Sequence, residues 1–111
     1  MNDIKNCNID NEVDEKGNPT GGHVMGVGLS IIWQNGPLGR GEERILPNGA
    51  FVETVISAAK QRIEFYQTAS DKKFACRENA VAITKLEEAL MWLEKRTKDR
   101  EERQVEGIHK V

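Results

Sequence analysis

Aromatic, amide and guanidinium side chains gather in this 111-residue chain in a combination that could hold a nucleotide. Phe65 and Tyr66 precede a short polar stretch, and Arg77 and Asn79 follow it. An aromatic ring stacks on a nucleobase, an amide reads the donors and acceptors of a base edge, and a guanidinium binds phosphate through paired hydrogen bonds. Three further arginines recur at helical spacing: Arg96, Arg100 and Arg103. These residue types favour a nucleotide-binding site.

Each of these sets also has a purely structural interpretation. The three spaced arginines could pair with neighbouring carboxylates on a solvated helix face. The carboxylates in question are Glu94, Asp99, Glu101 and Glu102. Phe65 and Tyr66 could close the core of a helical hairpin. Arg96 lies about 25 Å along a helix from Asn79, at 1.5 Å per residue. The two could therefore share a small ligand only if a second copy of the chain brought its Arg96 to this Asn79.

No set of residues matches a catalytic or metal-binding pattern. His23 and His109 lie far apart without a partner nearby in the sequence, and no phosphate-binding loop or metal-binding motif is present. Glu87 and Glu88 are adjacent, so on a helix they point about 100° apart and cannot act as an acid–base pair. We therefore expect a protein that is not an enzyme and that has no cofactor and no metal.

The N-terminal half predicts a small antiparallel sheet. Apolar residues alternate with small or polar ones from Met25 to Trp33, which predicts a half-buried strand. After a turn at 35–37, a short second strand is expected from Arg40 to Leu46, so that the sheet occupies 24–46. Residues 1–22 are polar and lack a period, and we expect them to form a flexible segment.

The C-terminal half predicts two helices. Apolar residues recur at spacings of three and four over 49–68 and again over 76–104. Asn48 is expected to cap the first helix. The short connection favours an antiparallel hairpin. The expected fold class is α+β, with a short N-terminal antiparallel β-sheet followed by a two-helix antiparallel hairpin in one domain over 23–111.

An apolar stripe on the second helix favours self-association. Ala89 and Trp92 remain uncovered once Leu86, Leu90 and Leu93 face the first helix. A large uncovered stripe on a small protein usually marks an interface, so we expect a homo-oligomer. The alternative is that the sheet covers this stripe within one chain.

The composition of the chain disfavours some classes of binding partner. The formal net charge is −2, which disfavours generic binding to DNA or to an anionic membrane. No stretch approaches the roughly 20 apolar residues of a membrane span, and the N-terminus has no apolar core of a secretory signal. We therefore expect a cytoplasmic protein.

Several segments of the chain resemble one known family. The segments 74–80, 83–93 and 96–100 resemble the anti-Thoeris sponge proteins of phages, which share a helical-hairpin domain with phage anti-CBASS sponges. Residues 33–37 and 105–109 are also similar to that family, so that the resemblance covers about 24–111.

This resemblance implies a function in immune evasion. Family members do no chemistry and bind cyclic ADP-ribose isomers, of the glycocyclic ADP-ribose type, that TIR-domain proteins make in the infected bacterial host. They assemble as dimers or hexamers, with the ligand between subunits. By resemblance, Phe65 or Tyr66 would stack on the ligand, and Asn79 and Arg96 would contact it.

Other functions stay open at this point. The chain could bind the cyclic di- or trinucleotides of CBASS defence. It could instead inhibit a host protein through the stripe of the second helix, or bind nucleic acid through Arg96, Arg100 and Arg103, although the acidic net charge counts against the last of these.

Overall fold

A computed structural model describes residues 7–36, 38–39 and 41–102. The described residues fall into two compact units, one ending at Phe51 and the other running from Val52 to Glu102. The first contains a sheet and the second a helical hairpin, which agrees with the α+β class expected from the sequence.

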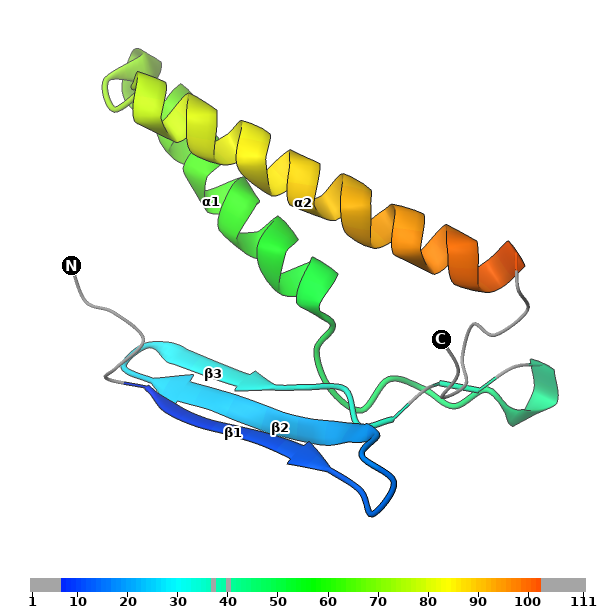
Figure 1. The fold of residues 1–111 in the computed structure, drawn as a ribbon. Coiled ribbons are helices and arrows are strands. Elements are labelled where there is room, and N and C mark those ends of the chain that lie inside the picture. The colour runs from blue at the N-terminus through cyan, green and yellow to red at the C-terminus, as the bar shows by residue number, and fades with distance from the viewer. Residues whose placement is uncertain (1–6, 37, 40, 103–111) are drawn as a thin grey trace. The chain divides into compact units, whose positions relative to one another are not determined.

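The sheet has three antiparallel strands in the order β1-β2-β3 (Figure 1). They are β1 (Asn8–Val13), β2 (Pro19–Gly26) and β3 (Leu29–Ile32). Asp14 closes the first turn, because its carboxylate accepts hydrogen bonds from the backbone N–H groups of Lys16 at 2.8 Å and Asn18 at 2.9 Å. In the second turn Gly28 has a φ of 75°, a left-handed conformation that glycine adopts without steric cost.

Two predictions about the N-terminal half are wrong. The segment 1–22 was expected to be flexible, but β1 and the start of β2 lie within 8–22. Residues 1–6 lie outside the described part. Every side chain of β1 is exposed, so the strand is held by backbone pairing and leaves no apolar alternation in the sequence. The stretch Met25–Trp33 is not one strand either, because the turn at 27–28 divides it between β2 and β3.

The second predicted strand, Arg40–Leu46, is also not formed over 41–46, and Arg40 lies outside the described residues. The chain makes a single 3₁₀ turn, η2 (Gly41–Glu43), and the N–H of Ile45 donates to the carbonyl of Leu38 at 2.6 Å. These local bonds fold the segment onto itself, so it does not pair with the sheet.

Asn48 does not cap the first helix, contrary to prediction. Its side-chain oxygen accepts a hydrogen bond from the N–H of Asn35 at 2.7 Å, and its own N–H donates to the side chain of Gln34 at 2.9 Å. Asn48 thus links the segment before the first helix to residues 34–35 within the first unit. The helix begins four residues later, at Val52.

The helices α1 (Val52–Lys72) and α2 (Arg77–Glu102) form the expected antiparallel hairpin (Figure 1). Regular helical geometry in α1 ends before Ala69, whose ψ is 150°, close to the predicted end at 68. The helix α2 begins one residue after its predicted start, and residues 103–104 of the prediction lie outside the described part.

The two helices meet through half-buried apolar side chains. These include Ile63 of α1 and Leu86, Leu90 and Leu93 of α2. Within the described residues no hydrophobic side chain is fully buried, and Trp92 is 59% exposed. Trp92 is therefore not covered by α1, as predicted, whereas Ala89, which was also expected to stay uncovered, is half-buried. None of the helices in the described ranges is long and apolar enough to cross a membrane.

Candidate functional site

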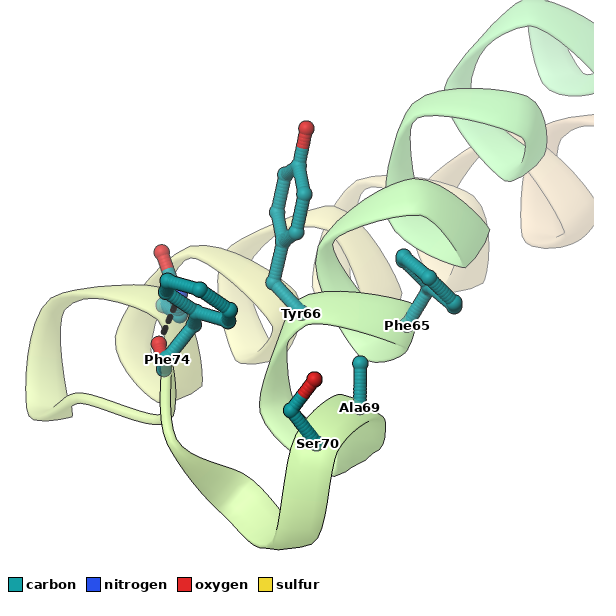
Figure 2. Close-up of a pocket in the computed structure, with 6 residues that line it drawn as sticks. Phe65, Tyr66, Ala69, Ser70 and Phe74 are labelled. Atoms are coloured by element: carbon teal, nitrogen blue, oxygen red, sulfur yellow. Dashed lines mark hydrogen bonds between the residues drawn. The ribbon is translucent and has the colours of Figure 1, made fainter.

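A pocket of about 420 Å³ lies at the end of the hairpin where α1 meets the connecting loop (Figure 2). Pockets that hold small molecules usually enclose about 300–1,000 Å³. The lining residues are Phe65, Tyr66, Ala69, Ser70, Phe74 and Asn79. Five of these six come from the end of α1 and the loop, and Asn79 comes from the first turn of α2.

Aromatic rings form most of the wall. Tyr66 stands between Phe74 on one side and Phe65 on the other in Figure 2. The ring centroids of Phe65 and Tyr66 lie 6.0 Å apart, with their planes tilted by 55°. Rings in this arrangement offer π faces on which a planar base can stack.

Arg62 supports two of these rings from one turn earlier on α1. Its guanidinium carbon lies 5.0 Å from the centroid of Phe65 and 5.0 Å from that of Tyr66, and its Nε donates to the Tyr66 hydroxyl at 3.2 Å. These contacts fix the ring orientations and place a positive charge beside the aromatic wall.

The loop brings Phe74 to the pocket through an unusual backbone path. Ser70, Asp71 and Lys72 all have positive φ, at 51°, 54° and 67°. Three consecutive residues in the left-handed region turn the chain sharply at the end of α1. The turn is closed by the N–H of Lys73, which donates to the Ser70 carbonyl at 3.1 Å.

Asn79 places an amide at the pocket. It is half-buried, and its Nδ2 donates to the backbone carbonyl of Phe74 at 3.4 Å, the bond drawn in Figure 2. Its own N–H donates to the Sγ of Cys76 at 3.4 Å, so that the thiol caps the start of α2. The pocket thus combines stacking surfaces with a group able to read a base edge.

The structure brings together three of the predicted site residues, Phe65, Tyr66 and Asn79. Arg77 is exposed at the first position of α2 and does not line the pocket. Arg100 lies near the opposite end of the same helix, and Arg103 lies outside the described residues.

Arg96 does not reach the pocket of its own chain. Its Nη2 pairs with the Oε1 of Glu53 at 3.4 Å, at the beginning of α1 and therefore at the end of the hairpin away from the loop. Two of the four acids suggested as partners of the arginines pair with lysines: Glu94 with Lys98 at 3.3 Å and Asp99 with Lys95 at 3.0 Å.

Sequence reasoning did not select Ala69, Ser70, Phe74 or Arg62 for the site. Phe74 had a usable signal, because it is a large apolar residue next to a polar loop, and it is 56% exposed in the structure. In the described ranges no group of three or more His, Cys, Asp or Glu side chains is placed to hold a metal ion.

Two comparisons with known proteins place the chain. Residues 25–98 match the family profile described as Acb2/Tad1, hairpin domain. A curated relative, Thoeris anti-defense 1 of Bacillus phage SBSphiJ7, is 55% identical over 62 residues, which are 56% of this chain and 42% of the relative. The matched part thus spans less than half the length of that relative. Because the profile covers well over half of the chain, and because an anti-Thoeris protein of a phage is so similar, the chain belongs to the Acb2/Tad1 hairpin-domain family, which confirms the resemblance to anti-Thoeris proteins.

Proposed function

We propose that the chain binds and sequesters a cyclic ADP-ribose isomer of the glycocyclic ADP-ribose type, without altering it, and so blocks Thoeris defence in the cytoplasm of the infected host. The observation that carries this proposal is the pocket at the loop end of the hairpin, where three aromatic residues meet the amide of Asn79. Family membership and the anti-Thoeris name of the phage relative direct the choice of ligand toward a Thoeris signal.

The pocket has groups that suit the adenine base of such a ligand but no arginine for its pyrophosphate. An adenine ring could stack on Phe65, Tyr66 or Phe74, and Asn79 could bind the edge of the base. The pyrophosphate needs cations, and no arginine lines the pocket. Three cations are candidates for that role: Arg62, whose guanidinium carbon lies 5.0 Å from the ring centroids of Phe65 and Tyr66, Arg77 at the start of α2, and an arginine from a second copy.

We propose that a second copy of the chain completes the site with its Arg96, in a dimer or a hexamer. The pair that Arg96 forms with Glu53 is largely exposed, with 58% and 37% of the two side chains accessible. Exposed ion pairs of this kind contribute about 0–1 kcal/mol, so a ligand phosphate could displace Glu53 at little cost. Met91 and Trp92, at 56% and 59% exposed, would supply apolar area for self-association.

Calorimetric titration tests the choice of ligand. The purified protein would be titrated with glycocyclic ADP-ribose and, in parallel, with cyclic di- and trinucleotides. Saturable binding of glycocyclic ADP-ribose supports the proposal. Binding of cyclic oligonucleotides alone would instead support the alternative function, evasion of CBASS defence. Binding of neither would favour a protein-binding inhibitor that uses the exposed face of α2.

Replacing Phe74 with leucine is expected to weaken binding of glycocyclic ADP-ribose about tenfold. Leucine keeps apolar bulk but removes the ring, and stacking of a base on an aromatic side chain is worth about 1–3 kcal/mol. Calorimetric titration measures the change. Phe74→Tyr keeps the ring and should bind within about twofold of the original protein; equal losses in both variants would show that Phe74 does not stack on the ligand.

A further inference from the structure

Gln67 joins the end of α1 to the start of α2 through both ends of its side-chain amide. Its Oε1 accepts a hydrogen bond from the N–H of Cys76 at 2.9 Å, and its Nε2 donates to the carbonyl of Cys76 at 3.1 Å. Gln67 is half-buried and does not line the pocket, although Tyr66 and Ala69 on either side of it do. The bonds span nine residues of sequence and close the whole connecting loop.

The loop that this pair of bonds closes has an unfavourable backbone conformation. Ser70, Asp71 and Lys72 are non-glycine residues with positive φ, a backbone conformation that is sterically unfavourable for residues with a Cβ atom. Conformations of this kind persist only when the surrounding contacts hold them. Lys73 N–H to Ser70 is a local bond, whereas Gln67 reaches across the loop to the next helix.

Cys76 is the residue through which the bonds act on the pocket. It caps α2, because its Sγ accepts from the N–H of Asn79 and its carbonyl accepts from the N–H of Ala80 at 3.2 Å. Phe74 lies two residues before Cys76 and Asn79 three residues after it, and these two are themselves bonded. The bonds from Gln67 fix the backbone of Cys76 and therefore also fix the positions of Phe74 and Asn79 in the pocket.

We propose that Gln67 is a positioning residue for the ligand pocket. It fixes Phe74 and Asn79 against Phe65 and Tyr66, so that the aromatic walls stand at the right separation before a ligand arrives. A preorganised pocket binds more tightly because less ordering remains to be done on binding. This inference rests on the proposed function only in its choice of ligand.

The test compares Gln67→Ala with Gln61→Ala, an exposed glutamine on the same helix. Gln67→Ala is expected to bind glycocyclic ADP-ribose about tenfold more weakly, since two hydrogen bonds of modest net worth are lost, while Gln61→Ala should bind normally. Circular dichroism at the titration temperature verifies that both variants keep their helices.

A second variant distinguishes positioning from general support of the fold. In Gln67→Glu the carboxylate can accept from the N–H of Cys76 but cannot donate to its carbonyl. Lowering the pH from about 7 to about 4 protonates a carboxyl group and restores the donor. Affinity should therefore recover on acidification in Gln67→Glu relative to Gln61→Glu, and it should do so even where Gln67→Ala fails to fold.

A ligand-free measurement separates failure of this inference from failure of the proposed function. In the original protein, nuclear Overhauser contacts should join the side-chain amide of Asn79 to Phe74, and Gln67→Ala should lose them. If the original protein binds no glycocyclic ADP-ribose, the proposed function fails and these contacts alone decide the role of Gln67. Retention of the contacts, or unchanged affinity in Gln67→Ala, overturns the inference.

Discussion

Replacing Asn79 with alanine is expected to weaken binding of glycocyclic ADP-ribose about a hundredfold, or about 2.7 kcal/mol. Two losses combine. The amide that faces the pocket disappears, and a paired amide–base contact is worth about 1–3 kcal/mol. The bond from Nδ2 to the Phe74 carbonyl also disappears, which releases the backbone of a neighbouring aromatic residue of the pocket. Calorimetric titration measures the affinity.

The matched control is Thr84→Ala on the same helix. Thr84 is exposed, and its hydroxyl donates to the carbonyl of Ala80 at 3.2 Å, so its replacement also removes one side-chain hydrogen bond from α2. It lies outside the pocket and should leave the affinity unchanged. Normal binding by Asn79→Ala would show that the ligand site lies elsewhere on the chain.

Replacing Arg96 with alanine is also expected to weaken binding about a hundredfold, although Arg96 lies far from the pocket of its own chain. A guanidinium that binds phosphate makes charge-assisted hydrogen bonds worth about 1.5–3 kcal/mol each. The free energy of unfolding should change by less than about 1 kcal/mol, because the ion pair between Arg96 and Glu53 is exposed. Titration and thermal unfolding of the same sample separate the two effects.

Mixing the two variants tests whether the site is shared between copies. In a pair formed from one Asn79→Ala chain and one Arg96→Ala chain, one site has both residues intact and the other has neither. After the variants are refolded together, high-affinity sites should reappear, in a smaller number than in the original protein. If mixing restores no site, Arg96 does not act from a neighbouring copy.

The helices and half of the pocket could be predicted because their signals are local. Apolar residues such as Ile63, Leu86 and Leu93 recur at helical spacing, and both helices lie within a few residues of their predicted bounds. Phe65, Tyr66 and Asn79 flank the connection between the helices, so the turn that joins α1 to α2 had to bring them near one another.

The strand β1 could not be predicted from its side chains. Its sequence, from Asn8 to Val13, is polar, and all of its side chains are exposed, so it has no buried face to impose alternation. Backbone hydrogen bonds to β2 and the carboxylate of Asp14 in the turn hold it. The alternation after Met25 was misleading because it continues through a turn at Gly28.

The remaining features of the site depend on contacts between residues distant in the sequence. The path that carries Phe74 to the pocket uses positive φ at Ser70, Asp71 and Lys72, and no glycine marks it. Gln67 has no sequence signal for its bond to Cys76. Likewise, Glu53 pairs with an arginine 43 residues away, whereas the sequence favoured acids on the helix of that arginine.

Recovery of the ligand after binding tests sequestration most directly. Glycocyclic ADP-ribose would be incubated with a molar excess of the protein, the free ligand removed by filtration, and the protein denatured to release what it holds. If the chain sequesters its ligand, the filtrate is depleted of ligand, and all of the ligand returns on denaturation with its mass unchanged by mass spectrometry. Ligand that stays in the filtrate, or that returns as a cleaved product, would contradict sequestration.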